Sequence, residues 1–290
     1  MYIDMFGKTR MKINLHLHTT VTDGQKSPEE AAEIYKNEGY DIVAITDHWK
    51  VSESKNINGL RILSGVEYNV NKNDSSVGVY HILGIGVKRQ PHVPDYPQAQ
   101  PVIDEIVRCG GIAILAHPAW SLNTPEQMKK LRNLSAVEIY NSVSDAHQSS
   151  RPYAGHFVDT CANQGIILPL VAADDTHYYD EGDCTKSFIM LECKKDATDD
   201  EILSAIKQGK FYSSQGPEIH IMRDREDIVV NCSPADRISL FSNMVWGEDY
   251  CIRGNGVTQM RHKINPQEKF IRAEVTDKNG NKAWSNIIKL

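Results

Sequence analysis

The chain has 290 residues, of which 40% are hydrophobic and 24% are charged, a composition typical of a globular protein with a sizeable core. Its 32 Lys and Arg against 38 Asp and Glu give a net charge of −6, with no basic run of the kind that contacts duplex nucleic acid, so we expect no duplex nucleic acid partner. No apolar run is long enough to cross a bilayer, so we expect no membrane span.

Short apolar runs alternate with capped helices from Lys12 to about Phe211. The predicted strands are residues 12–17, 41–46, 61–68, 80–85, 112–116, 136–140 and 166–172. Most are apolar on both faces, which is typical of parallel strands covered by helices. The helix-start signal, Ser or Thr followed three residues later by Glu or Gln, occurs at residues 27–30, 124–127 and 198–201. This alternation predicts an α/β barrel or a doubly wound sheet.

The pattern changes after Gly216-Pro217. Residues 270–276 alternate strictly between apolar and polar, residues 277–280 form a predicted turn, and no capped helix is evident. We therefore expect a barrel domain over residues 1–212 and a small, sandwich-like antiparallel β domain over residues 213–290.

Histidines and carboxylates gather at the predicted strand ends. Six of the eleven histidines lie at or near these ends: His16, His18, His48, His81, His117 and His177. Carboxylates accompany them at Asp23, Glu67, Glu138 and Asp175. Because the C-terminal ends of parallel strands converge, these side chains are expected to meet. Imidazole mixed with carboxylate suits Zn²⁺, Mn²⁺ or Fe rather than Mg²⁺ or Ca²⁺.

Each of these residues also has an ordinary structural interpretation. His81 alone would be a hydrogen-bonded core residue, and Asp47 beside His48 would cap the next segment. His16 and His18, however, share one face of a strand and can reach one ion. The order of all these histidines and carboxylates at successive strand ends favours a metal site over coincidence.

The motifs, in that order, resemble the polymerase and histidinol phosphatase (PHP) superfamily over about two-thirds of the chain. They are His16-Leu17-His18-Thr19, Thr46-Asp47-His48, Gly65-Val66-Glu67, His81, Ala116-His117-Pro118 and Asp175-Thr176-His177. Residues 211–219, 275–286 and 137–141 also resemble the carbaryl-hydrolase-like (CehA/McbA) branch, whose members often carry a C-terminal β extension.

The resemblance implies a distorted seven-stranded (β/α) barrel that binds two or three divalent ions. The first ion would be held by His16, His18, Glu67 and Asp175. The second would share Glu67 and add His81 and His117. The third would be held by Asp23, His48 and His177, although histidine is common in the family where this chain has Asp23.

The implied chemistry is hydrolysis. Two adjacent cations lower the pKa of a water between them and polarise a phosphoryl group, so no protein nucleophile is required. We predict a metal-dependent phosphoesterase that acts, through a metal-bridging hydroxide, on a small phosphomonoester or phosphodiester, nucleotide-derived ones included. Asp23 or His177 would supply a general acid where the third position is empty.

Substrate contacts are predicted at Glu138, Asn141 and Arg151. The first two could equally support the metal ligands or the fold, and Arg151 is one of four loop cations that could contact phosphate: Lys26, Arg89, Arg151 and Lys186. Four further histidines outside the motifs are expected not to be ligands: His147, His156, His220 and His262.

Two other functions remain open. One is metal-dependent hydrolysis of a carboxylic ester or carbamate, in an apolar rather than cationic pocket. The other is a non-catalytic module with a closed metal shell. The start of the chain lacks the apolar segment of a secretory signal and the six cysteines form no Cys-x-x-Cys pair, so we expect a cytoplasmic protein with free thiols.

Overall fold

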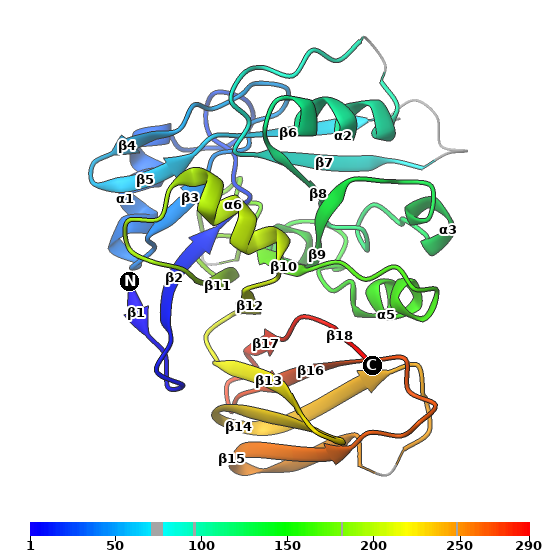
Figure 1. The fold of residues 1–290 in the computed structure, drawn as a ribbon. Helices are drawn as coiled ribbons and strands as arrows, with labels where there is room; N and C mark the ends of the chain where they lie inside the picture. Colours follow the sequence, from blue (N-terminus) through cyan, green and yellow to red (C-terminus); the bar gives the residue numbers. More distant parts are fainter. Residues whose placement is uncertain (71–77, 95–96, 181, 248) are drawn as a thin grey trace.

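The computed structural model describes residues 1–70, 78–94, 97–180, 182–247 and 249–290, and places its strands in two sheets (Figure 1). The first sheet begins with β1 (Tyr2–Ile3), β2 (Thr9–Asn14), β3 (Ile42–Ala44), β4 (Lys55–Ile57), β5 (Leu60–Leu63), β11 (Phe188–Glu192) and β12 (Phe211–Ser214). The second contains β6 (Gly65–Val70), β7 (Tyr80–Ile85), β8 (Ile112–Leu115), β9 (Leu134–Asn141) and β10 (Leu170–Ala173).

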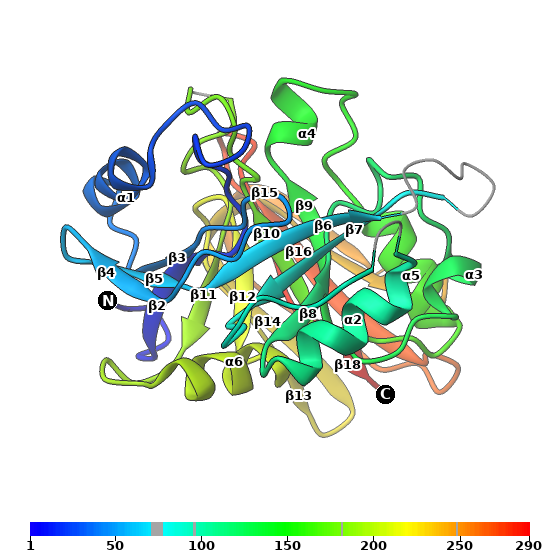
Figure 2. The same cartoon turned by 90° about the horizontal axis from the view of Figure 1, so that it is seen from above.

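Helices surround these strands, as Figure 2 shows for the view from above. They are α1 (Pro28–Asn37), α2 (Ala99–Arg108), α3 (Pro125–Met128), α4 (Val143–Ala146), α5 (Gly155–Asn163) and α6 (Asp199–Lys207). The helix starts predicted at Ser27, Thr124 and Thr198 all form complete capping boxes. No helix in the described ranges has the length and apolar character needed to cross a membrane.

A shared core lies between the two sheets. Its buried aliphatic side chains come from both, for example Ile13 and Ile42 from the first sheet and Leu83 and Ile114 from the second. Isolated bridges join the sheets at their edges, Leu17 to Thr176 and His48 to Glu67. The segments that follow β2, β3 and β10 are thereby brought to one end of the core.

The α/β class is confirmed, but the strands differ from the expected parallel series. β7 runs antiparallel to both β6 and β8. Residues 71–79 separate β6 from β7, fewer than the dozen or so that a parallel crossover requires. β11 and β12, which were not predicted, pair antiparallel with each other and continue the first sheet. The closed seven-stranded barrel stays a prediction.

The predicted strand 61–68 is divided at Ser64 into β5 and β6, which belong to different sheets. The division depends on Gly65, where a Cβ atom would lie 2.4 Å from the carbonyl oxygen of Ile45. Only glycine therefore allows β6 to start so close to the end of β3. This close approach brings Glu67 beside His48.

The C-terminal segment forms antiparallel strands that extend the first sheet (Figure 1). They are β13 (Ile219–Asp224), β14 (Asp227–Ser242), β15 (Cys251–Lys263), β16 (Phe270–Thr276), β17 (Lys282–Trp284) and β18 (Ile288–Lys289). β17 pairs with both β16 and β12, so hydrogen bonding is continuous across the expected boundary at residues 212 and 213.

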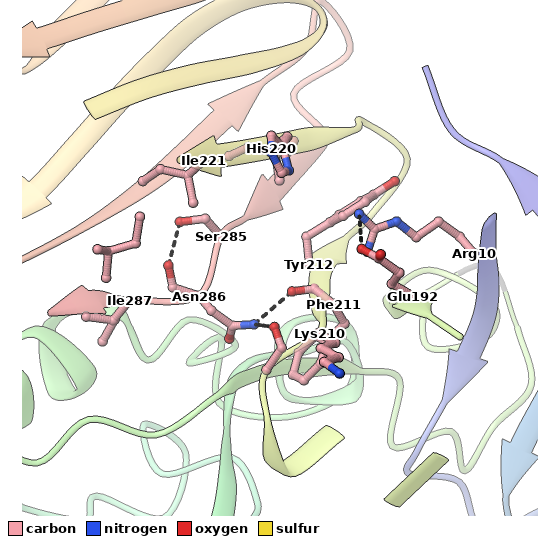
Figure 3. Close-up of a pocket in the computed structure, with 13 residues that line it drawn as sticks. Arg10, Glu192, Lys210, Phe211, Tyr212, His220, Ile221, Ser285, Asn286 and Ile287 are labelled. Atoms are coloured by element: carbon pink, nitrogen blue, oxygen red, sulfur yellow. Dashed lines mark hydrogen bonds and ion pairs between the residues drawn. The ribbon is translucent and has the colours of Figure 1, made fainter. Parts of the chain in front are cut away.

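Polar contacts also hold the C-terminal strands against the rest of the chain. The Asn286 amide donates to the carbonyl oxygens of Gly209 and Phe211 and accepts from the N–H of Leu170, beside a cleft of about 240 Å³ (Figure 3). The fully buried Arg272 of β16 donates to both carboxylate oxygens of Asp159 on α5, at 2.6 and 2.7 Å.

We predict that Asp159→Ala lowers the free energy of unfolding by about 3 kcal/mol, because it removes a partner of a buried guanidinium. Glu274 also pairs with Arg272, so the loss stays at the lower end for a buried pair. Urea denaturation measures the change. The control is Asp236→Ala, at an exposed site, and an equal effect of both substitutions would show that the buried pair contributes nothing particular.

Candidate metal centre

All nine side chains predicted as ligands converge at one end of the core. Three groups of donors are close enough to hold an ion each: His16, His18, Glu67 and Asp175; Glu67, His81 and His117; and His18, Asp23, His48 and His177. We call them the first, second and third positions. They come from the segments after β2, β3, β8 and β10 and from within β6 and β7.

The first position has the dimensions of a tetrahedral metal site. Its donor atoms are Nε2 of His16, Nε2 of His18, Oε2 of Glu67 and Oδ1 of Asp175. Five of the six distances among these atoms are 3.0 to 3.3 Å. The centre of a tetrahedron with such edges lies about 2 Å from each corner, which is the usual Zn–N and Zn–O bond length.

The electrostatics of the first position also fit a cation. Its four side chains are at most 6% exposed, and no Lys or Arg in the described ranges pairs with Glu67 or Asp175. Oδ1 of Asp175 is buried without a hydrogen-bond partner. Burial raises the pKa of both carboxyl groups, yet the neighbouring His16 holds the pKa of each well below its usual value. The two buried carboxylates therefore stay ionised only with a positive charge beside them.

Glu67 joins the first position to the second. Its Oε2 faces His16 and His18, whereas its Oε1 lies 2.8 Å from Nδ1 of His81 and 3.5 Å from Nε2 of His117. Each carboxylate oxygen is therefore directed at a different position. Nε2 of His117 also lies 3.7 Å from Oδ2 of Asp175, so a second carboxylate borders both positions.

The third position is wider and more open. Oδ2 of Asp23 lies 3.5 Å from Nε2 of both His48 and His177, and its side chain is 50% exposed. His18 borders this position as well, because its Nδ1 lies 3.5 Å from Oδ1 of Asp23 and has no hydrogen-bond partner. The sequence assigned His18 to the first ion alone, since a motif does not show which way each ring nitrogen points.

Glu138 and Asn141 support the ligands and do not line the pocket. Oε1 of Glu138 lies 2.8 Å from Nδ1 of His16, and its Oε2 accepts from the backbone N–H of His117. The Asn141 amide donates to Glu138 and to Asp175. Both side chains are fully buried. Glu138 thereby fixes the His16 tautomer that leaves Nε2 free for a metal.

Several buried polar residues lie beside the ligands in roles that the motifs do not reveal. Asp174 accepts hydrogen bonds from the Tyr35 hydroxyl and from the backbone N–H groups of Lys186 and Ser187. Burial raises the pKa of Asp174 to about 7. Asp47 lies beside the centre and accepts from the N–H and hydroxyl of Thr19, which fixes the loop after His18. Such roles depend on tertiary contacts alone.

Two ligands have left-handed backbone conformations, His117 with φ 26° and Asp175 with φ 55°. Non-glycine residues in this region cost of order 1–3 kcal/mol and persist where the surroundings impose them. In both residues the left-handed conformation turns the side chain from the strand end toward the shared centre.

Seven of the nine predicted ligands, all but the buried His16 and His18, line a pocket of about 150 Å³ together with Trp120, Ser144 and Gln148. The indole of Trp120 makes edge contacts with the rings of His81 and His117, with centroids 5.5 and 5.0 Å away. The four loop cations predicted as phosphate contacts, Lys26, Arg89, Arg151 and Lys186, are not among the described lining residues. Arg151 is exposed outside the pocket.

The fold is shared with a solved structure. A two-domain protein from Bacteroides vulgatus ATCC 8482, described as containing a predicted PHP-like metal-dependent phosphoesterase, is 15% identical, with a TM-score of 0.54 over 99% of this chain and 97% of that chain. The two chains therefore share a fold, as the resemblance to the PHP superfamily led us to expect. No protein-family model and no curated protein matches the sequence. The CehA/McbA branch stays a prediction.

The expectation of no duplex nucleic acid partner is not supported. Endonuclease Q, in a complex with a 27-mer duplex substrate whose abasic lesion lies at the active site, is 16% identical, with a TM-score of 0.47 over 69% of this chain and 57% of that chain. The exclusion applied the net charge of the whole chain to a local site. Bound divalent cations supply positive charge at such a site whatever the net charge is.

We predict that affinity for Zn²⁺ rises with pH. Burial lowers the pKa of His18, but the neighbouring carboxylates of Asp175 and Glu67 raise it on balance to about 9. Below that pH the metal-free protein keeps a proton that the ion must displace, so affinity should rise roughly tenfold per pH unit for each displaced proton. Competition with a chelating dye between about pH 6.5 and 9 measures this, and a flat profile would contradict it.

We also predict that Glu138→Gln weakens metal binding about 10- to 100-fold, although Glu138 touches no ion position, because the orientation of His16 depends on it. Glu126→Gln, on an exposed helix, serves as the control. Calorimetric titration of metal-free protein compares the two. Equal affinities would show that Glu138 has only a packing role.

Proposed function

We propose that this chain is a metal-dependent phosphoesterase that hydrolyses a small phosphomonoester or phosphodiester. The observation that carries the proposal is the tetrahedral donor set of the first position, joined through Glu67 to a second donor set at the base of a pocket. The nitrogen and oxygen donors suit Zn²⁺, Mn²⁺ or Fe²⁺. When bound, two such ions supply Lewis acidity and lower the pKa of a nearby water.

The residues of the chain have separate tasks in this account. His16, His18 and Asp175 hold the buried first position, and Glu67 sets its distance from the second through its two oxygens. Glu138 holds the ring of His16 in place. The partial exposure of His81 leaves the second position open toward the pocket, where an ester group can approach.

Where the third position holds no ion, His177 is the better proton donor. Burial raises the pKa of Asp23, but the hydrogen bond from His177 and the nearby His18 and His48 lower it on balance. Burial lowers the pKa of His177, yet Asp23 and Asp175 raise it on balance. The proton of the pair therefore resides on His177, which borders the pocket and can pass it to a leaving oxygen.

The pocket favours a substrate of low charge. No Lys or Arg occurs among the residues that the structure shows lining it, so the ions alone would neutralise a phosphate. A phosphodiester, with one negative charge, places a smaller demand on them than a phosphomonoester does.

Trp120 supports a second candidate, the hydrolysis of a carboxylic ester or carbamate. Its half-buried indole borders the second position and offers an apolar wall to an uncharged group. The same ions would polarise a carbonyl group as they would a phosphoryl group.

We also propose that the two sheets form the distorted barrel of the PHP superfamily and that its boundary with the C-terminal domain lies at residues 212 and 213.

Zn²⁺- or Mn²⁺-loaded protein should hydrolyse bis-p-nitrophenyl phosphate, and Glu67→Gln should lose at least about 100-fold in rate because both positions lose a charged ligand. The control is Glu226→Gln, whose carboxylate is exposed in the turn between β13 and β14. Release of p-nitrophenol reports the rate.

A comparison of two substrates separates the alternatives. Hydrolysis of p-nitrophenyl acetate but not of bis-p-nitrophenyl phosphate would favour the second candidate. An unchanged rate in Glu67→Gln would overturn both, and no turnover of any ester by fully loaded protein would favour a non-catalytic module.

A further inference from the structure

A fourth group of donors lies outside the three positions. It consists of His147, directly after α4, and of Asp180 and Asp183 in the segment after β10. One donor atom from each residue lies within 4.8 Å of the other two. None of the three belongs to the motifs, and His147 was expected not to be a ligand.

The distance between His147 and Asp180 suits two ligands of one ion. Nε2 of His147 lies 2.9 Å from each carboxylate oxygen of Asp180. Two donors that each lie about 2.1 Å from an ion and form a right angle there are about 3 Å apart. A surface ion pair would explain this distance equally well, so the third residue decides.

Asp183 is fully buried, and only one of its two carboxylate oxygens accepts hydrogen bonds in the described part of the chain. Its Oδ2 accepts the backbone N–H groups of His177 and Tyr178, both at 2.7 Å. Its Oδ1 is buried with no partner in the described part of the chain. A buried carboxylate oxygen without a partner costs free energy, which a bound cation would recover. The ion pair of His147 with Asp180 does not provide that partner.

Gly182 keeps the space between the donors clear. A Cβ atom there would lie 2.5 Å from Cβ of Ala146 and 3.3 Å from Nε2 of His147. Its backbone N–H donates to Oδ1 of Asp180 at 2.8 Å, which orients that carboxylate. The ring of Tyr178 stacks on the imidazole of His147, with centroids 4.1 Å apart, and restricts its rotation.

We propose that His147, Asp180 and Asp183 bind a divalent cation of the Zn²⁺ or Mn²⁺ class at a site separate from the metal centre. This ion also fixes the segment that carries His177, because Asp183 holds the N–H of that residue. The third position, which His177 borders, is thereby made more rigid. The inference does not depend on which ester the chain hydrolyses.

The test counts ions. Full-length protein freed of metal is titrated with Mn²⁺ alone, and bound metal is measured after gel filtration. His147→Ala/Asp180→Asn should bind one ion fewer per chain than the wild type. The matched control, His156→Ala/Asp236→Asn, changes an exposed His and Asp elsewhere and should bind the same number as the wild type. Equal ion numbers and affinities in all three proteins would overturn the proposal.

A second measurement concerns the segment itself. In the wild type and the control, Mn²⁺ should slow hydrogen exchange at the Tyr178 amide by at least tenfold more than it does in His147→Ala/Asp180→Asn. Both changed side chains are at least partly exposed, so the double variant is expected to fold, and its circular dichroism verifies this. Equal slowing in the variant would show that any ion bound there does not fix the His177 segment.

Discussion

Two carboxylates, Glu67 and Asp175, lie against two imidazoles in a buried space, with nitrogen-to-oxygen distances of about 3 Å. Burying charges of one sign is costly unless opposite charge accompanies them, and no Lys or Arg in the described ranges pairs with either carboxylate. In metal-free protein the protons on His16 and His18 supply this charge, as the raised pKa values of both indicate. A divalent cation would supply it with better geometry. Much of the surrounding structure follows from holding these four groups together.

The supporting features each answer that requirement. Gly65 permits the abrupt change of sheet that brings Glu67 to the site. The left-handed conformations of His117 and Asp175 turn ligands inward at strand ends. Glu138 links ligands from two sheets, since it contacts both His16 and His117. The buried polar residues around Asp174 lie beside them. These features stabilise one arrangement of donors at the expense of local strain and burial of polar groups.

The sequence predicted which side chains converge better than it predicted the strands around them. Residue types in a fixed order point to the site, so the convergence of His16, His18, Glu67 and Asp175 was expected without knowledge of the sheet. The split at Ser64, the antiparallel course of β7 and the pairing of β12 with β17 depend on contacts between distant segments. Periodicity within a segment holds no information on such pairings. The second nitrogen of His18 and the unpartnered oxygen of Asp183 are also visible only in three dimensions.

The central claim, that the strand ends hold adjacent ions bridged by Glu67, is tested most directly by anomalous diffraction from crystals grown with Mn²⁺ or Zn²⁺. The account predicts a peak among His16, His18, Glu67 and Asp175 and a second peak on the His81 and His117 side of Glu67. Diffraction from metal-replete crystals that shows no peak between the His16 and His18 rings and Glu67 would contradict it.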